Sequence, residues 1–364
     1  MLLFEINHPG HIHLFRNLSQ ALLEKGIPSL FLIKSDPVME RLAEFYDLPV
    51  VRMGQKGKGL LQKYLFQLRF VWKSVGLARK TKAGLGMGVS MTLPMVSKYI
   101  SMHSITLDDD DMAATPVFAR YANKANVVLT PDALAHENRG EHHIKYPGYH
   151  ELAYLHPNRF TADPEVLTLL GVKADERWFV VRFNAFRAHH DVGEGGMSFE
   201  QKKQLVEQLK KYGKVFISAE GEVDPEFRPM LLPDRPELMH SFLAYATLYV
   251  GESQTMTSEA AVLGTPALKC NTFAGRLSVP NELEEKYGLC YAFLPADFER
   301  MMLKLDELLA MPDLKGEWQQ RRERMLKDKI DVTAFLAWLV EGYPESVEKV
   351  KKGGSGVFER WMGK

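Results

Sequence analysis

The stretch LYVGESQTMTSEAAVLGTPALKCN, residues 248–271, places polar residues where a predicted strand gives way to a predicted helix. The apolar run ends at Gly251, and the helix is expected to begin near Thr255 or Thr257. The first amides of a helix have no partner within the helix, so they can hold an anion such as a phosphate. We therefore expect a phosphate-binding turn that consists of Ser253, Gln254, Thr255 and Met256.

Glu259 lies in the first turns of the same predicted helix. A carboxylate there can accept hydrogen bonds from sugar hydroxyls, as acidic residues do for ribose in dinucleotide-binding folds. A structural interpretation fits about equally well: Thr257 caps the helix, Glu259 interacts favourably with the helix dipole, and residues 264–266 form a turn.

A second group of candidate residues, His8, Gly10, His11 and His13, follows the apolar run LLFEIN at the start of another helical pattern. Gly10 lets the backbone turn tightly or approach a ligand closely, and His8 lies beside it. Imidazole titrates near neutral pH, so His11 can act as a general base or donate to a phosphate. A turn with only a structural role is the first alternative. A zinc site is weaker, because two histidines two residues apart diverge at a helix start and no carboxylate accompanies them.

The segment TLDDDD, residues 106–111, ends a further predicted strand with four carboxylates. Repulsion between like charges favours a raised pKa in one of the four, which would suit that carboxylate to act as an acid or base. A solvated turn, with one aspartate capping the next helix, is equally consistent with the pattern. A magnesium site is a weaker third interpretation, since hard cations prefer oxygen ligands.

Two further residues are candidates for ligand contact. Arg182 ends the predicted strand RWFVVRF, and its guanidinium suits phosphate oxygens; Arg187, His189 and His190 follow in the next loop. A surface ion pair is the structural alternative for Arg182. His240, in ELMHSFLAYA, is either near a bound ligand or a helix-start residue without a contact.

The elements that position these residues alternate between strand and helix patterns from the first residue, which is typical of parallel α/β sheets. We predict an α/β fold with two Rossmann-like domains whose parallel sheets face across a cleft, with ligands at the carboxyl ends of the strands. The expected domains are residues 1–155, residues 156–335, and residues 336–364 as a C-terminal helix that packs back toward the first domain, with a tail.

The composition is that of an ordinary globular protein, with 46 Lys and Arg balancing 46 Asp and Glu. This balance argues against a nonspecific nucleic-acid partner, so any anion site must be local. Cys270 and Cys290 lack the spacing of a zinc site or a disulfide framework. No run reaches membrane-spanning length and no signal-peptide pattern opens the chain, so we expect a cytoplasmic location.

The strand, polar loop and EAAVLGTPAL together resemble the nucleotide-sugar half of GT-B glycosyltransferases and of UDP-N-acetylglucosamine 2-epimerases. The resemblance implies that Glu259 holds the ribose, that the loop holds the diphosphate, that His240 lies where GT-B proteins contact the nucleotide base, and that Gly10 and His11 contact the acceptor or assist catalysis. It also suggests an acid or base role for Asp110 or Asp111. Where the epimerases usually have two glycines after the strand, this chain has Ser253 and Gln254. For Arg182 the resemblance implies only phosphate binding. The epimerases have a catalytic His and an Arg at the end of this strand, where this chain has Arg-Phe-Asn.

The chain resembles more closely the prokaryotic family called domain of unknown function 354, over about residues 1–340. The segments that carry this resemblance are HPGHIHLFRNL, TLDDDD, GYHELAYLHP, TMTSEAAVLGTPAL and NELEEKYGL. From these resemblances we expect a GT-B glycosyltransferase that uses a nucleotide sugar, with UDP as the expected nucleotide, in the synthesis of cell-surface glycans or glycoconjugates. A nonhydrolysing 2-epimerase and a non-catalytic nucleotide-sugar-binding protein are the alternatives.

We expect no cofactor and no metal, because a helix start and Arg182 can stabilise the leaving diphosphate. The acceptor is a sugar or a lipid-linked molecule. A peripheral membrane contact is compatible with the basic segment that contains Lys56 and Lys58 and with the residues after it, Leu60, Leu61, Tyr64 and Phe66. The pattern nevertheless favours a helix that faces the core.

Overall fold

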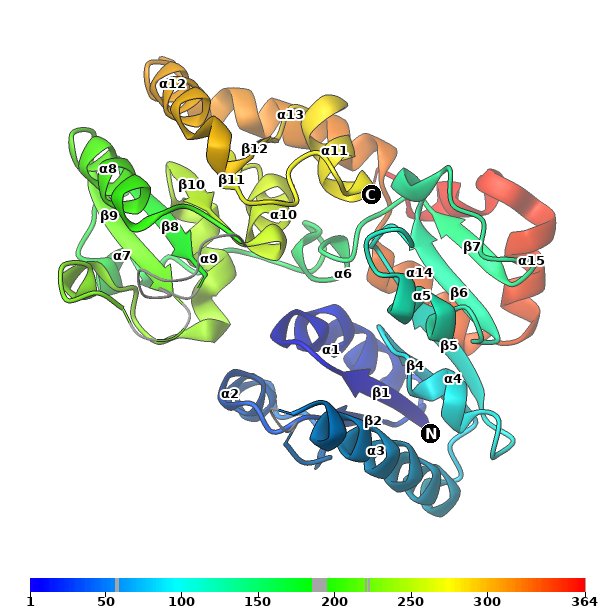
Figure 1. Cartoon of the computed structure of the whole chain (residues 1–364). Coiled ribbons are helices and arrows are strands. Elements are labelled where there is room, and N and C mark those ends of the chain that lie inside the picture. Colours follow the sequence, from blue (N-terminus) through cyan, green and yellow to red (C-terminus); the bar gives the residue numbers. More distant parts are fainter. Residues whose placement is uncertain (56–58, 185–194, 220, 222, 364) are drawn as a thin grey trace. The chain divides into compact units, whose positions relative to one another are not determined.

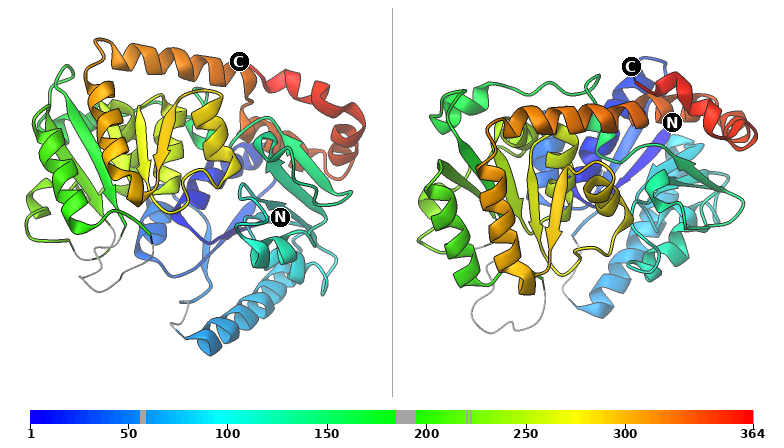
Figure 2. Two further views of the ribbon diagram at one scale, coloured as in Figure 1. Left: turned by 45° about the horizontal axis from the view of Figure 1, so that its top comes forward. Right: turned by 90° about the horizontal axis from the view of Figure 1, so that it is seen from above.

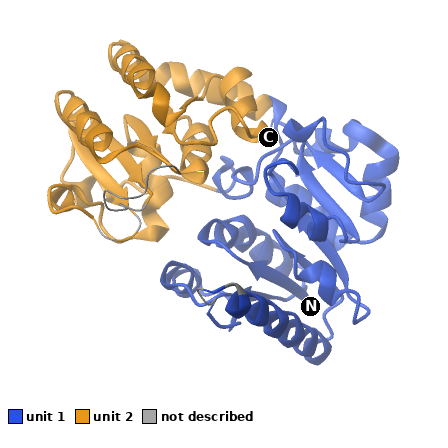
Figure 3. Ribbon diagram, viewed as in Figure 1, with its two compact units in different colours: residues 1–159, 328–364 blue, residues 160–327 orange. Residues whose placement is uncertain are grey.

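The chain forms two compact units, which are coloured separately in Figure 3. The computed structural model describes residues 1–364 except 56–58, 185–194, 220, 222 and 364. Unit 1 contains residues 1–159 and 328–364, and unit 2 contains residues 160–327. The sequence-based boundaries lie after residues 155 and 335. The residues Lys56, Lys58, Arg187, His189 and His190 lie outside the described part of the chain.

Unit 1 is built on a seven-stranded sheet with the order β3-β2-β1-β4-β5-β6-β7, in which every neighbouring pair is parallel (Figure 1). Its strands are β1 (Leu2–Ile6), β2 (Ser29–Ile33), β3 (Val50–Arg52), β4 (Leu85–Gly88), β5 (His103–Leu107), β6 (Val127–Pro131) and β7 (His143–Tyr146). The helices between them are α1 (Pro9–Leu23), α2 (Pro37–Phe45), α3 (Leu60–Thr81), α4 (Leu93–Val96), α5 (Pro116–Ala122), η1 (Asp132–Leu134) and α6 (Leu152–Leu155).

Unit 2 is built on a five-stranded parallel sheet with the order β12-β11-β10-β8-β9. Its strands are β8 (Trp178–Phe183), β9 (Lys214–Ala219), β10 (Leu248–Gly251), β11 (Ala267–Cys270) and β12 (Cys290–Phe293). Its helices are α7 (Glu165–Leu170), α8 (Phe199–Lys210), η2 (Arg228–Met230), η3 (Pro236–Leu238), α9 (Met239–Tyr245), α10 (Gln254–Leu263), α11 (Ser278–Glu285), η4 (Pro295–Asp297), α12 (Phe298–Leu309) and α13 (Leu314–Asp328).

The chain leaves unit 2 through the long helix α13 and completes unit 1 with α14 (Val332–Glu341), α15 (Glu345–Gly353) and η5 (Gly354–Trp361), drawn from orange to red in Figure 2. α14 is strongly apolar and packs against α1 and α6 of unit 1. The C-terminal segment is fixed by aromatic packing, because the rings of Phe335 and Trp361 lie 5.4 Å apart.

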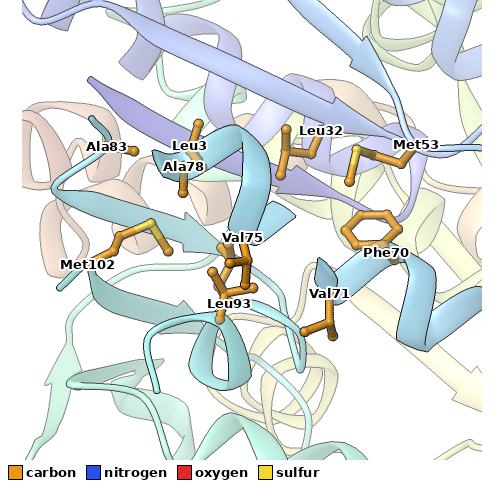
Figure 4. Packing of buried hydrophobic residues seen from close by; sticks show 11 residues of the cluster. Leu3, Leu32, Met53, Phe70, Val71, Val75, Ala78, Ala83, Leu93 and Met102 are labelled. Atoms are coloured by element: carbon orange, nitrogen blue, oxygen red, sulfur yellow. The ribbon is translucent and has the colours of Figure 1, made fainter. Parts of the chain in front are cut away.

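The core of unit 1 includes a cluster in which apolar residues of β1 and β2 meet one face of α3 and the segment around α4 (Figure 4). Val71, Val75 and Ala78 recur every three or four residues and form one stripe of the helix, and Phe70 lies beside Val71 at its edge. This stripe packs over the sheet and leaves the other side of α3 outside the core.

The predicted α/β fold class with two parallel sheets is confirmed. Strands β7 and β12 are not among the predicted strands, because each lies where turn and helix signals dominate the local pattern. Among the described residues, no helix combines the length and apolarity that crossing a bilayer requires.

In each sheet the strand order reverses at one point, between β1 and β4 in unit 1 and between β8 and β10 in unit 2. Neighbouring crossovers run to opposite sides at such a point, so a crevice opens beyond the carboxyl ends of the two strands. Each switch point therefore marks a place for a ligand within its own unit.

Candidate functional site

The loop after β1 is folded by its own side chains at the unit 1 switch point. His8 is the N-cap of α1, and its Nδ1 accepts a hydrogen bond from the Gly10 amide at 3.1 Å. The Asn7 amide donates to Nδ1 of His11 at 3.3 Å. A neutral His11 ring with Nδ1 occupied carries its proton on Nε2, so it is a donor at that atom.

The charge of His11 is strongly disfavoured by its surroundings. Burial lowers the pKa of His11 to about 3, and the positive charges of His8 and His150 contribute to the same shift. His11 is therefore neutral throughout the physiological pH range. This state suits a hydrogen-bond donor better than a general base, because a base works best with a pKa near the operating pH.

Glu5 is a buried carboxylate at the same switch point that the sequence analysis missed. Its oxygens accept hydrogen bonds from Asn7 Nδ2 and Thr92 Oγ1, both at 3.0 Å, and from the Ser90 hydroxyl. Burial raises the pKa of Glu5, while these hydrogen bonds act in the opposite direction. A charged residue inside the apolar run LLFEIN was the available signal. Glu5 ties the loop after β1 to the loop after β4.

The four aspartates after β5 have different partners. Asp108 is buried and paired with the buried guanidinium of Arg139, which also donates to the Asp110 carbonyl at 2.8 Å. Asp109 Oδ2 lies 3.3 Å from His150 Nδ1. Within the described residues, no hydrogen bond or ion pair engages the Asp110 carboxylate. Asp110 is therefore the member of the run that is available for chemistry.

The pKa values of these groups separate accordingly. Burial opposes the charges of both Asp109 and His150, yet their ion pair lowers the pKa of Asp109 and raises that of His150. Burial, with Asp109 and Asp108 nearby, raises the pKa of Asp110 to about 7. Burial also raises the pKa of Asp108 to about 6, although Arg139 acts against this shift. Asp110 thus has the pKa expected of a general acid or base near neutral pH.

Asp111 belongs to a separate group with His136 and Glu137, whose ligand atoms all lie within 4.8 Å of one another. His136 Nε2 lies 3.2 Å from Asp111 Oδ1, and Glu137 Oε1 accepts from the Met112 amide at 2.9 Å. Such a group can hold a metal ion. However, the Arg139 guanidinium lies 3.5 Å from Glu137 Oε2, and its charge disfavours a cation there.

In unit 2, Arg182 lies at the switch point between β8 and β10. Its Nη1 donates to Ser218 Oγ at 2.6 Å. Gly251, the neighbouring residue on β10, lets the strands pack closely, because a Cβ there would lie 2.8 Å from Arg182 Cβ and 2.4 Å from the Tyr249 hydroxyl. Glycine at position 251 therefore leaves the space that Arg182 occupies beside β10.

Glu252 is a second buried carboxylate that the sequence analysis missed. It accepts from the amides of Asn184 at 2.7 Å and Met197 at 2.6 Å, and Lys202 Nζ lies 3.3 Å away. Its own amide donates to the Arg182 carbonyl at 3.0 Å. A glutamate between an apolar strand and a helix cap was the available signal. Glu252 holds the two strand ends of the switch point together.

Helix α10 begins directly after this turn. Ser253 is the N-cap, and its hydroxyl accepts from the Met256 amide at 3.3 Å. Gln254 accepts a hydrogen bond from the buried ammonium of Lys269, while Ser253, Gln254 and Thr255 are half-buried. The amides of Gln254 and Thr255 occupy the first positions of the helix, where amides lack intrahelical acceptors. The helix ends at Gly264, which has a φ of 74°.

Glu259 and His240 form a buried pair within unit 2. His240 Nε2 lies 3.0 Å from Glu259 Oε1, and both residues are buried. His240 is the second residue of α9, so it is a helix-start residue, but it is not without contacts: its ring also meets that of Phe160 edge-on. The structure therefore brings these two predicted site residues together. A ribose hydroxyl that binds Glu259 must share the carboxylate with His240.

Comparisons with known proteins identify relatives of both the sequence and the fold. A family model described as "Protein of unknown function (DUF354)" matches residues 2–289. An uncharacterised protein of Methanocaldococcus jannaschii is 22% identical over 288 residues, which cover 73% of this chain and 80% of that protein.

Two solved structures represent the two groups of enzymes that share the fold. The spinosyn forosaminyltransferase SpnP has a TM-score of 0.62 and 16% identity, with 93% of this chain and 99% of that chain covered. A UDP-N-acetylglucosamine 2-epimerase has a TM-score of 0.63 and 12% identity, with 94% and 96% covered. At these identities the likeness concerns the fold, which is the GT-B-like fold of glycosyltransferases and 2-epimerases.

Proposed function

The chain belongs to the DUF354 family of proteins of unknown function, and on this premise we propose that it is a nucleotide-sugar-dependent glycosyltransferase. The observation that carries the proposal is the switch point of unit 2, where Arg182 near the end of β8 pairs with Gly251, the last residue of β10 before the turn into α10. Arg182 and the start of α10 both favour an anion, the first by its charge and the second by its unpaired amides and helix dipole.

In this proposal the diphosphate of the donor binds at the start of α10 and to Arg182. The amides of Gln254 and Thr255 donate to phosphate oxygens, and Arg182 neutralises part of their charge. Because negative charge grows on the diphosphate as the sugar leaves, these donors stabilise the transition state more than the ground state. The reaction then needs no metal ion at the diphosphate.

Unit 1 supplies the groups for proton transfer. Asp110 removes the proton from the acceptor hydroxyl, since its carboxylate has no competing partner among the described residues and its pKa is about 7. His11 donates a hydrogen bond from Nε2 to a substrate oxygen. The raised pKa of Asp110 results mainly from burial, and the negative charge of Asp109 adds to it.

Acceptor-dependent release of nucleoside diphosphate tests this function. The full chain is first screened by thermal unfolding with UDP, GDP, CMP and TDP compounds, because a ligand at a hundredfold its dissociation constant adds about 2.7 kcal/mol to stability. The sugar nucleotide that stabilises the chain is then incubated with a panel of sugar and lipid-linked acceptors. We expect release that depends on an acceptor and is lost in Asp110→Asn. Binding without turnover for every acceptor would instead support a non-catalytic nucleotide-sugar-binding protein.

A 2-epimerase is the second candidate, and the titratable groups around Asp110 favour it. Proton removal at C2 of the sugar requires an acid and a base, and Asp110, Asp109 and His150 lie together after the strands of one sheet. Incubation with UDP-N-acetylglucosamine in deuterated water separates the two functions. Deuterium uptake at C2 without any acceptor would identify an epimerase and would contradict glycosyl transfer.

A further inference from the structure

Helix α3 has one face in the core of unit 1 and one face outside it. The inner face presents Phe70, Val71, Val75 and Ala78 to the cluster shown in Figure 4. This packing accounts for the helix as a structural element. It does not account for the exposed apolar residues on the adjoining side of the helix.

The outer face of α3 carries large apolar side chains in the open. Leu61 is 70% exposed and Trp72 is 57% exposed, and Leu65 and Leu68 between them are also exposed. At 100° per residue these four residues fall within one narrow sector of the helix. Tyr64 is 61% exposed beside them, and Tyr99 extends the sector, because its ring lies 5.2 Å from that of Trp72. A contiguous exposed patch of this kind marks an interaction surface.

The segment of the chain that carries this patch has charged side chains of a single sign. The whole chain is neutral, yet residues 48–107 contain no Asp or Glu. Their basic residues are Arg52, Lys56, Lys58, Lys63, Arg69, Lys73, Arg79, Lys80, Lys82 and Lys98. Arg69, Lys73 and Lys80 are exposed and fall along one flank of the leucine and tryptophan sector.

We propose that this surface docks on an anionic phospholipid bilayer. We call it the α3 surface; it consists of Leu61, Tyr64, Leu65, Leu68, Trp72 and Tyr99 with the basic residues Arg69, Lys73, Arg79 and Lys80. Leucine and tryptophan enter the boundary between headgroups and acyl chains, while the basic flank binds the lipid phosphates. Phe66, which sequence analysis grouped with the exposed residues, packs against the core instead.

The charge pattern favours a bilayer over the other occupants of an apolar patch. A second copy bound through the same surface would place basic residues against basic residues, which repel. Interfaces with other proteins are depleted in lysine, whereas this one is rich in it. Nucleic acid binds basic surfaces through phosphates and gives exposed leucines no role.

Sedimentation of the full chain with lipid vesicles tests the proposal. We expect binding to vesicles of phosphatidylglycerol and phosphatidylcholine in equal parts, little binding to phosphatidylcholine alone, and weaker binding as salt is raised. The double variants Leu68→Gln/Trp72→Gln and Arg69→Glu/Lys80→Glu should each weaken binding by about tenfold or more. All of these positions are exposed, and unchanged circular dichroism and melting temperature verify that each variant is folded.

Two matched controls carry the same kinds of substitution elsewhere. Leu303→Gln changes an exposed leucine on α12, and Lys352→Glu reverses a charge on α15, and both should bind as wild type does. Absence of wild-type binding to anionic vesicles would overturn the proposal, as would equal binding by the double variants. Self-association that Leu68→Gln/Trp72→Gln abolishes, without vesicle binding, would assign the surface to a second copy. None of these outcomes depends on the sugar chemistry proposed above.

Discussion

At the scale of single residues, the run of four aspartates becomes four different groups through their partners. Asp108 is paired with Arg139, Asp109 with His150, and Asp111 with His136, while the Asp110 carboxylate has no such partner among the described residues. Burial raises the pKa of Asp110 to about 7, and the nearby charges of Asp109 and Asp108 add to this shift. These contacts distinguish Asp110, a candidate for proton transfer, from the three paired aspartates.

The pH dependence of the reaction tests the role of Asp110. If its carboxylate is the base, kcat/KM should rise with pH up to about 7 and then level off, because only the ionised form accepts a proton. Asp110→Asn should lower kcat by roughly a hundredfold or more. A pH profile that stays flat between about pH 5 and 8 would exclude Asp110 as the base.

The same carboxylate should reduce the stability of the protein at high pH. Its pKa is raised from 3.8 to about 7, so the folded chain binds more protons than the unfolded chain between these values. The free energy of unfolding therefore falls as pH rises through this window. Asp110→Asn should be about 1 to 2 kcal/mol more stable than wild type near pH 8, with solvent screening taken into account, and close to wild type near pH 4. Urea unfolding at both pH values measures this difference; a variant less stable than wild type near pH 8 would contradict the proposed environment.

At the scale of elements, the turn between β10 and α10 positions the helix start at which we propose that phosphate binds. Gly251 allows the close approach to Arg182, Glu252 holds the neighbouring loop amides, and Ser253 caps the helix. Each of the three consecutive residues performs a different task. The start of α10 depends on all of them for its position.

Glu252→Gln tests this turn. The substitution leaves the buried Lys202 ammonium without its nearby carboxylate, and breaking a buried pair in this way costs about 3 kcal/mol or more. We expect a correspondingly lower free energy of unfolding in urea. Glu207→Gln on α8 is the matched control, because its partner Lys210 is on the surface, and it should have little effect. Equal stability of Glu252→Gln and wild type would mean that Glu252 does not organise the turn.

At the scale of the whole molecule, periodicity and turn residues were sufficient to predict the fold class, since long strands and amphipathic helices leave clear patterns. The short strands β7 and β12 leave no such pattern. The positions of Arg182, Ser253 and Gln254 at a strand end and helix start also followed from the sequence, because these depend on neighbours along the chain.

Contacts between distant residues could not be predicted in this way. The pairs of Asp108 with Arg139, Asp109 with His150, and Glu259 with His240 join residues on different elements, and only the folded chain brings them together. The outer face of α3 is a similar case. The sequence pattern of α3 fits a core helix. Which of its apolar residues are buried and which are exposed depends on how the rest of unit 1 packs against it.

The central claim is that the switch point of unit 2 binds the diphosphate of a nucleotide sugar, and calorimetric titration of the full chain with UDP tests it most directly. We expect saturable binding without added metal, a loss of about tenfold or more in affinity for Arg182→Ala, and unchanged affinity for Arg300→Ala on the exposed face of α12. Equal affinity of Arg182→Ala and wild type for UDP, or no binding of UDP or any other nucleoside diphosphate by wild type, would contradict it.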